Sequence, residues 1–280
     1  MFTILEKKLL NPTVAQIVIN APLIAKKAEA GQFVILRAKA TSERLPLTVA
    51  AYDREHGTIT LIFQIVGMGT AELNSLEQGD AILDCVGPLG EPTHTEGLHK
   101  VCVVGGGVGC AIALPVARKL YHQGAEVHSV IGFRTKDLVI LEDAFKAVSK
   151  ELRVMTDDGT HGEKGLVTSA LEALIQAGNQ YDEVIAIGPL VMMKFVCLLT
   201  RKYGIKTVVS MNPIMVDGTG MCGGCRLTVG GETKFACVDG PDFDGHLVDF
   251  DEAISRSSMY TEFECCARDE ACNLFAKEVR

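Results

Sequence analysis

The sequence predicts a multi-domain protein: an N-terminal antiparallel β-barrel, an α/β domain with a parallel sheet, and a small C-terminal subdomain. Three observations support this. Short strand-like runs fill residues 1–97, strands and helices alternate over 98–210, and a glycine- and cysteine-rich stretch opens the segment 211–280. The 280 residues are enough for two or more domains, because a domain commonly has about 100–200 residues.

The N-terminal stretch consists of short runs rich in β-branched and apolar residues. Glycines and prolines such as Gly31, Gly57 and Gly87-Pro88 separate these runs, a spacing typical of a small barrel or sandwich. Thr70–Leu76 is the one plausible helix here. The expected strands are the first residues from Met1, then Val14–Asn20, Phe33–Ala38, Leu47–Tyr52 and Thr58–Val66.

The pattern changes near His99, where strands begin to alternate with helices. This alternation predicts a parallel sheet with helices on both faces. After residue 210 the chain is glycine-rich with short strand signals, and beyond Asp251 it is mostly helical in pattern. The expected strands of the α/β domain are Lys100–Val104, Glu126–Ile131, Leu152–Thr156 and Glu183–Ile187, and the expected helices are Ala111–Gln123, Leu141–Ser149, Leu166–Ala177 and Val191–Tyr203.

Composition excludes several classes of function. The net charge of −8 gives no support to nucleic-acid binding or to attraction by an anionic membrane surface. No run of about 18 apolar residues predicts a membrane span, and the N-terminus lacks the pattern of a signal peptide. Ten cysteines without a secretion signal indicate thiols or metal ligands, so we expect a cytoplasmic protein in a reducing compartment.

The most specific motif is a spacing of Asp217, Cys222, Cys225 and Cys237 on a glycine-rich loop. Plant-type ferredoxins hold a [2Fe-2S] cluster with Cys-x4-Cys-x2-Cys and a distant fourth Cys. Here Asp217 occupies the first thiolate position and the other three cysteines are present. Thiolates suit iron–sulfur clusters, and the glycines let backbone N–H groups approach the sulfurs. The motif therefore predicts a [2Fe-2S] site.

Two alternatives remain open for this motif. A Cys-x2-Cys pair also occurs in structural zinc sites, but zinc prefers four Cys or His ligands and the nearest histidine is His246. The fourth ligand is the less certain one, since Asp239 or water could replace Asp217. An oxygen ligand would change the reduction potential and weaken the hold on the cluster.

A second motif, Gly105-Gly106-Gly107-Val108-Gly109, lies between a predicted strand and a predicted helix. Backbone N–H groups and a helix N-terminus can bind a pyrophosphate there, so we expect a dinucleotide, although a tight turn without ligand is the alternative. In the G-x-G-x-x-G register the third position is Cys110, which departs from the pattern.

Residues after other strands of this domain are further dinucleotide candidates. Gly188 and Pro189 end a strand at the carboxyl edge of the sheet, and Asp158 lies in a similar loop; either could be a simple turn. Arg134 follows the second strand, where an acidic residue would select NAD. This arginine suits a 2′-phosphate and hints at NADP(H), or it is a solvated surface residue.

The barrel carries a third, weaker motif. Arg44 precedes the strand residues Pro46, Leu47 and Thr48, and Gly69-Thr70 opens the short helix downstream. An arginine, a hydroxyl and a helix start could bind a flavin pyrophosphate, whereas a turn with a surface arginine is the alternative. Gln64, at the end of the intervening strand, is grouped with these cofactor-binding candidates.

The remaining cysteines form two groups. Cys85, Cys102, Cys110 and Cys197 lie in apolar runs and are expected to be buried structural residues. A trio in the tail stays without a role, because adjacent cysteines rarely bind one metal together; it comprises Cys265, Cys266 and Cys272.

Together these motifs resemble the ferredoxin-reductase-like electron-transfer subunits, over nearly the whole chain. The group includes the electron-transfer subunit of dihydroorotate dehydrogenase. The closer resemblance is to the small subunits of NADH-dependent ferredoxin:NADP oxidoreductases, also known as the beta subunits of sulfide dehydrogenase. The segments that carry it are Arg44–Thr48, Gly87–Gly90, Gly105–Gly109, Thr156–Gly159, Asn212–Cys225 and Phe235–Pro241.

The resemblance implies FAD in the barrel, held by Arg44, Thr48 and Thr70, and NAD(H) at Gly105–Gly109. Leu47-Thr48 replaces the usual aromatic-Ser pair, so the group that stacks on the flavin ring is open. Such subunits pass electrons through the cluster to a larger subunit with a second FAD and [4Fe-4S] clusters, and the pair bifurcates electrons toward ferredoxin. In that family NADP(H) binds the larger subunit, so we follow NAD(H) here despite Arg134.

Asp217 favours one relative over the other, because the dihydroorotate dehydrogenase subunits have Cys at this position and the ferredoxin:NADP oxidoreductase subunits have Asp. We therefore expect an NAD(P)H-dependent flavin and iron–sulfur oxidoreductase subunit that forms a heterodimer. The alternatives are a dihydroorotate dehydrogenase electron-transfer subunit, a zinc-stabilised nucleotide-binding regulator, and a flavin reductase that works without a partner.

Overall fold

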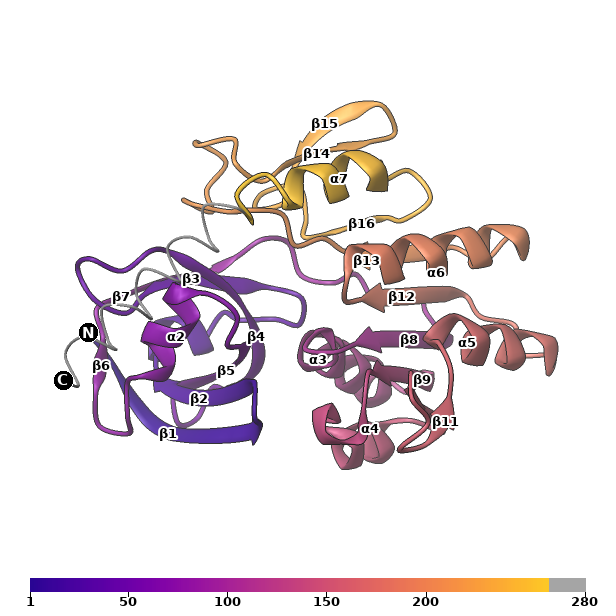
Figure 1. Cartoon of the computed structure of the whole chain (residues 1–280), viewed down its shortest axis with the longest axis horizontal. Helices are drawn as coiled ribbons and strands as arrows, with labels where there is room; N and C mark the ends of the chain where they lie inside the picture. The colour runs from indigo at the N-terminus through magenta and orange to yellow at the C-terminus, as the bar shows by residue number, and fades with distance from the viewer. Residues whose placement is uncertain (262–280) are drawn as a thin grey trace.

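The computed structural model describes residues 1–261 and confirms the predicted architecture of a barrel, a parallel-sheet domain and a C-terminal subdomain (Figure 1). The trio Cys265, Cys266 and Cys272 lies outside the described residues. The boundaries at residues 97 and 210 stay predictions, because the third segment also adds a strand to the second sheet.

Seven antiparallel strands form the nearly closed barrel in the order β6-β1-β2-β5-β4-β3-β7. Strand β2 illustrates the cause: Ala15, Ile17 and Ile19 alternate along it and are buried inside the barrel. Strands β6 and β7 were not expected, since one is very short and the other contains glycine and proline. The elements are β1 (Phe2–Asn11), β2 (Val14–Asn20), α1 (Pro22–Ala25), β3 (Phe33–Arg37), β4 (Leu45–Asp53), β5 (Thr58–Gln64), α2 (Met68–Asn74), β6 (Ala81–Ile82) and β7 (Asp84–Leu89).

The second sheet has the order β11-β10-β9-β8-β12-β13-β16, and its strands from β11 to β13 run parallel. Helices α3 and α4 contribute to the apolar core on one face, and α5 and α6 contribute to the core on the other. The elements are β8 (Lys100–Gly106), α3 (Gly109–His122), β9 (Glu126–Phe133), η1 (Lys136–Leu138), α4 (Glu142–Val148), β10 (Glu151–Thr156), β11 (Glu163–Lys164), α5 (Val167–Gln176), β12 (Glu183–Ile187), α6 (Leu190–Lys202) and β13 (Thr207–Ser210).

The strand order reverses beside β8. The chain builds β9, β10 and β11 on one side of β8 and then returns to place β12 on its other side. In open α/β sheets a crevice forms at the carboxyl ends of the strands where the order reverses, and ligands bind there. The ends of β8 and β12 are therefore the expected ligand site.

The third segment joins both other parts. A hairpin of β14 (Arg226–Val229) and β15 (Glu232–Phe235) turns at Gly230-Gly231, whose positive φ angles of 61° and 82° suit the tight turn. Strand β16 (Asp242–Asp244) then pairs antiparallel with β13, and α7 (Phe250–Ser257) packs on α6 (Figure 1). This segment therefore holds its loops against the second domain.

A polar junction ties the three parts together at Thr93. Its backbone N–H donates to the carbonyl of Ala30 in the barrel, and its hydroxyl donates to Asp242 Oδ2 on β16 at 2.6 Å. The other carboxylate oxygen of Asp242 is buried with no hydrogen-bond partner. Burial therefore raises the pKa of Asp242, and the hydroxyl bond from Thr93 partly opposes this.

The Asp242→Asn variant should gain stability over the wild type as pH rises. An acid whose pKa is raised on folding binds more protons when folded, so stability is lost between the unfolded pKa of about 3.9 and the higher folded value. Asparagine keeps an acceptor for Thr93 and removes this loss. Melting temperatures at pH 5 and pH 8 measure the difference.

The matched control is Asp244→Asn, on the same strand, whose exposed side chain accepts from the N–H of His246. This control should follow the wild type at both pH values. Parallel pH profiles for the wild type and Asp242→Asn would contradict the assignment of a raised pKa.

Candidate functional site

The cluster loop, residues 217–225, and the more distant Cys237 present the oxygen and sulfur donors in two pairs, Asp217 with Cys222 and Cys225 with Cys237. Asp217 Oδ2 accepts the backbone N–H of Cys222 at 3.1 Å, and the sulfurs of Cys225 and Cys237 lie 3.2 Å apart. Cys222 is exposed, whereas Cys225 and Cys237 are buried. Each iron of a [2Fe-2S] cluster takes two protein ligands, so this donor set fits such a cluster.

The predicted ligand atoms of Asp217, Cys222 and Cys237 accept hydrogen bonds that stabilise negative charge on them. Bonds from Thr219 and from the N–H of Cys222 hold the pKa of Asp217 at about 2, which keeps its carboxylate ionised. The N–H of Gly224 donates to Cys222 Sγ at 3.4 Å, and the N–H of Gly220 is directed at Cys237. These backbone donors, expected from the glycines, are the kind that tune iron–sulfur centres.

The rival ligands are engaged elsewhere. Asp239 accepts the backbone N–H of Phe235 at 2.7 Å, which closes the turn after β15. His246 Nε2 lies 3.0 Å from the hydroxyl of Thr200, on α6. Within residues 1–261 no three His, Cys, Asp or Glu side chains gather around a single point as they would for one metal ion. Asp217 is the one of these three side chains that has a hydrogen bond to a residue of the cysteine motif.

The cluster loop touches the barrel wall directly. Gly218 has a φ of +79°, and a Cβ there would lie 2.5 Å from Ile35 Cδ1 and 2.8 Å from Leu89 Cδ1. Ile35 is buried on β3 and pairs with Pro46 on β4. One layer of side chains therefore separates the cluster loop from the strand that carries the predicted flavin motif. Sequence reasoning missed Ile35, because nothing local marks it.

The glycine motif lies at the carboxyl end of β8, where the strand order reverses. Gly106 packs against the loop after β12: a Cβ there would lie 2.4 Å from Met192 Sδ and 3.0 Å from Pro189 Cδ. A Cβ on Gly109 would lie 2.5 Å from the carbonyl oxygen of Ile187 and 2.7 Å from Gly188 Cα. The structure thus brings together two of the predicted dinucleotide-binding segments, Gly105–Gly109 and Gly188-Pro189.

The start of α3 is open to an anion. Gly107 has a φ of +55°, and no atom lies within 4 Å of the position that its Cβ would take. The N-cap residue Val108 makes no side-chain capping bond. The N–H groups of Cys110 and Ala111 donate to the carbonyls of Gly107 and Val108, so the N–H groups of Val108 and Gly109 are the ones suited to phosphate oxygens. This loop therefore fits the pyrophosphate of a dinucleotide.

Arg134 and Asp158 lie at the same edge of the sheet. The N–H of Asp158 donates to the carbonyl of Arg134, so the loops after β9 and β10 are neighbours. The Asp158 carboxylate accepts from the N–H and hydroxyl of Thr160, which lowers its pKa and forms a local turn. Both residues are exposed. Asp158 thus has a structural role in its loop, while the side chain of Arg134 is exposed after the carboxyl end of β9.

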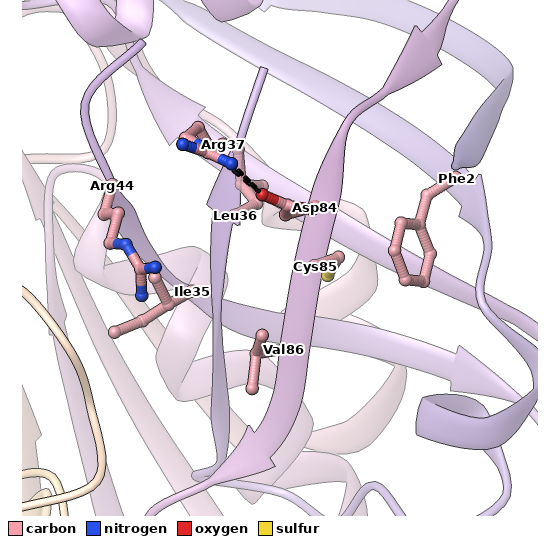
Figure 2. A pocket seen from close by; sticks show the side chains of 8 residues that line it. All are labelled: Phe2, Ile35, Leu36, Arg37, Arg44, Asp84, Cys85 and Val86. Carbon is pink, nitrogen blue, oxygen red and sulfur yellow. Dashed lines mark hydrogen bonds and ion pairs between the residues drawn. The ribbon is translucent and has the colours of Figure 1, made fainter. Parts of the chain in front are cut away.

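Arg44 lines a cavity of about 330 Å³ against β3 and β7 (Figure 2). In Figure 2 its guanidinium lies beside Ile35, and Arg37 pairs with Asp84 on the neighbouring strand β7. The ion pairs formed within residues 1–261 do not include Arg44. Because the Arg44 guanidinium has no carboxylate partner in this cavity, its positive charge is suited to a phosphate group.

Strand β4, which carries the predicted flavin motif and is called the flavin strand below, faces the α/β domain. Strand β4, with Pro46, Leu47 and Thr48, packs against α3. Ala50 on β4 and Ile62 on β5 are buried in one apolar core with the residues of α3. A flavin on this strand would therefore lie beside the helix whose first turn carries the glycine motif.

The other barrel candidates shape the turn before α2. The hydroxyl of Thr70 accepts the N–H groups of Val66 and Gly67 and so closes the turn. Gly69 lies under the side chain of Glu43, whose Oε1 would be 2.1 Å from a Cβ there, so this turn adjoins the Arg44 loop. Gln64 ends β5, next to β4, and pairs with Val14. The structure thus gathers these residues on one side of the barrel.

The cysteines outside the cluster motif are buried, as expected. Cys85, Cys102, Cys110 and Cys197 are each at most 8 % exposed. Burial raises the pKa of the Cys85 and Cys197 thiols to about 12 and raises those of Cys102 and Cys110 as well. Such thiols are inert structural residues. No helix in residues 1–261 has the length and apolar character needed to span a bilayer.

Comparisons with known proteins agree with this geometry. Residues 212–249 match the family model described as the iron–sulfur cluster binding domain of dihydroorotate dehydrogenase B. That range contains Asp217, Cys222, Cys225 and Cys237. The match supports iron–sulfur binding over the zinc alternative.

Curated relatives extend the likeness to most of the chain. The chain is 48 % identical over 246 residues to a Thermotoga maritima homologue of the dihydroorotate dehydrogenase B (NAD+) electron transfer subunit, covering 88 % of this chain and 86 % of the homologue. It is 32 % identical to the Streptococcus mutans electron transfer subunit, over 86 % of this chain and 95 % of that protein. The chain belongs to the family of dihydroorotate dehydrogenase B electron transfer subunits and their homologues.

One solved structure matches this chain over almost its whole length. A structure of an NADH-dependent reduced ferredoxin-NADP oxidoreductase, reported for flavin-based electron bifurcation, contains a chain that is 44 % identical, with a TM-score of 0.92. The match covers 97 % of this chain and 98 % of that one. A cytochrome P450 reductase from Amycolatopsis shares the fold at 21 % identity and a TM-score of 0.59, over 72 % of this chain and 65 % of that one.

These findings confirm an oxidoreductase subunit of the ferredoxin-reductase-like type. Its fold is that of proteins which bind FAD and NAD(P), and its C-terminal segment is an iron–sulfur cluster binding domain. The expected cofactor classes are therefore confirmed. The individual residues that contact each cofactor stay predictions.

Proposed function

We propose that this chain is the electron-transfer subunit of a heterodimeric, electron-bifurcating ferredoxin:NADP oxidoreductase. In this proposal it takes electrons from NADH, passes them through FAD to a [2Fe-2S] cluster, and delivers them to a larger subunit that carries a second FAD and [4Fe-4S] clusters. Ferredoxin would be reached only through that larger subunit.

One observation supports this most strongly: the likeness at 44 % identity and a TM-score of 0.92 spans almost the whole of both chains. Asp217 at the first ligand position agrees with it, since the resemblance assigns Asp to that subgroup and Cys to the dihydroorotate dehydrogenase subunits. The backbone N–H of Cys222 donates to Asp217 Oδ2, which holds this carboxylate oxygen beside the cysteine ligands of the cluster loop.

The chain's residues would hold the three groups in sequence. When bound, the dinucleotide and flavin exchange electrons in pairs and the cluster carries them singly. Gly105–Gly109 and Gly188-Pro189 would bind the dinucleotide at the crevice, and Arg44 would bind a flavin phosphate. Asp217 and the three cysteines would hold the cluster, one side-chain layer from the flavin strand.

The test is purification without oxygen of the chain with its natural partner, followed by spectra before and after NADH. We expect flavin and iron–sulfur absorption that bleaches with NADH, and a partner that contains FAD and [4Fe-4S] clusters. NADH together with reduced ferredoxin should then reduce NADP+. A colourless complex that contains zinc would contradict the proposal.

The second candidate is the electron-transfer subunit of an NAD-dependent dihydroorotate dehydrogenase. Seven relatives at 30 to 48 % identity that carry this description, one of them as a homologue, favour it. The same purification separates the two functions. A partner that oxidises dihydroorotate, and NAD+ reduction that depends on dihydroorotate, would establish this candidate in place of the first.

Dinucleotide preference gives a separate prediction. We expect NADH to bind at least about tenfold more tightly than NADPH, because the family resemblance places NADP(H) on the larger subunit. Arg134→Ala should leave NADH affinity unchanged, since NADH lacks the 2′-phosphate that the exposed guanidinium would bind. Fluorescence titration of both dinucleotides measures this, and tighter NADPH binding that is lost in Arg134→Ala would reverse the assignment.

A further inference from the structure

Two arginine side chains donate hydrogen bonds to the backbone between the Cys-x2-Cys ligands. Arg226 Nη1 donates to the carbonyl of Gly223 at 3.1 Å, and Arg256 Nη2 donates to the carbonyl of Gly224 at 3.3 Å. These two glycines are the residues between Cys222 and Cys225. Arg226 is local to the loop, whereas Arg256 comes from α7, 32 residues away from Gly224.

Helix α7 is attached firmly enough to direct Arg256 at the loop. Asp249 caps the helix by accepting the N–H of Glu252 at 2.9 Å, and the N–H of Asp249 donates to Thr228 on β14. The Glu252 carboxylate accepts the N–H of Thr228 at 3.1 Å. Reciprocal bonds of this kind fix the helix against the hairpin that begins directly after Cys225.

The positive charge of Arg256 lies in a partly apolar setting. Its half-buried side chain lines a cavity of about 300 Å³ between the cluster loop and α7, with Ile214, Val216 and Met259. The ion pairs within residues 1–261 include neither Arg256 nor Arg226. The electrostatic interaction of an unpaired charge with a neighbouring charge is screened less in such a setting than in water, so it is effective over a longer distance.

We propose that Arg256 and Arg226 are positioning residues for the iron–sulfur cluster, which clamp the Gly223-Gly224 backbone and raise the reduction potential of the cluster. The inference rests on the proposed function, because it requires a cluster on this loop. Reduction adds a negative charge to the cluster, so a nearby guanidinium stabilises the reduced form. The clamp also limits movement of Cys222 and Cys225 relative to each other.

The experiment compares full-length Arg256→Gln, Arg256→Lys and Arg226→Gln with the wild type, all purified without oxygen. The control is Arg201→Gln, because Arg201 donates to the carbonyl of His246, away from the cluster loop. Redox titration followed by electron paramagnetic resonance gives the cluster potential. Iron and sulfide analysis gives cluster content, and circular dichroism checks folding.

At the wild-type midpoint potential, Arg256→Gln should lower the ratio of reduced to oxidised cluster at least about threefold, which is ~28 mV for one electron. Arg256→Lys should recover most of this shift, since it keeps the charge. Arg226→Gln should shift it in the same direction but less, because its side chain is exposed. Arg201→Gln should equal the wild type.

Unchanged potential and unchanged iron content in both Arg256→Gln and Arg226→Gln would overturn the clamp. Loss of iron from folded Arg256→Gln would support it. If Arg256→Gln does not fold, the potential of Arg226→Gln against Arg201→Gln decides. A wild type without cluster signal would overturn the proposed function instead, so the two failures are distinguishable.

Discussion

Cys225→Ser is expected to remove the iron–sulfur cluster while the flavin stays bound. Cys225 is 1 % exposed and its sulfur lies 3.2 Å from that of Cys237, so the two thiols form a buried pair of donors. A serine hydroxyl is a poor substitute for a soft thiolate. Changes outside the ligands alone cost metal sites ~10–100-fold in affinity, so iron content should fall at least about tenfold.

Iron and sulfide analysis, together with the visible spectrum, measures the loss. The matched control is Cys197→Ser, which alters a buried thiol on α6 away from the cluster loop. This control should lose some stability, because it buries a hydroxyl, yet keep its iron. Equal iron in Cys225→Ser and the wild type would remove Cys225 from the ligands.

Gly109→Ala is expected to weaken NADH binding at least about tenfold, which is about 1.4 kcal/mol. A Cβ at this position would lie 2.5 Å from the carbonyl oxygen of Ile187 and 2.7 Å from Gly188 Cα. Both contacts are with backbone, which cannot turn aside as a flexible side chain can. The start of α3 must therefore shift away from the loop after β12, and the phosphate-binding site of the proposal changes shape.

Titration of flavin bleaching with NADH gives the affinity. Gly204→Ala is the control: this glycine follows α6 with a φ of +66° and open space around it, so alanine strains the backbone by about 1 kcal/mol in the same domain. The control should bind NADH normally despite a lower melting temperature. Normal NADH affinity in Gly109→Ala would limit the glycine to a packing role.

The fold brings the two redox sites of the proposal close together on the outer face of the barrel. Gly218 of the cluster loop lies against Ile35, and Ile35 pairs across the sheet with Pro46 of the flavin strand. On its other side the flavin strand packs against α3, the helix that follows the glycine motif. These contacts support the order dinucleotide, flavin, cluster that the proposed function requires.

The architecture and the cofactor classes could be predicted from the sequence because each has a local signal. Alternation along β2 and β-branched runs marked the barrel, and a strand, a glycine cluster and a helix marked the nucleotide loop. The spacing from Asp217 to Cys237 marked the cluster, since iron ligation on one loop constrains residues near in sequence. Strands β6 and β7 could not be predicted because β6 has only two residues and β7 contains Gly87 and Pro88.

The tertiary structure decided what depends on residues distant in the chain. It joined Gly106 to Pro189 at the point where the strand order reverses, and it engaged Asp239 in a turn while leaving Asp217 beside Cys222. It also brought Arg256 to Gly224 from α7. The sequence by itself thus determined which chemistry the chain carries, whereas long-range packing determined which side chains share each site, because such contacts leave no periodic or spaced pattern in the chain.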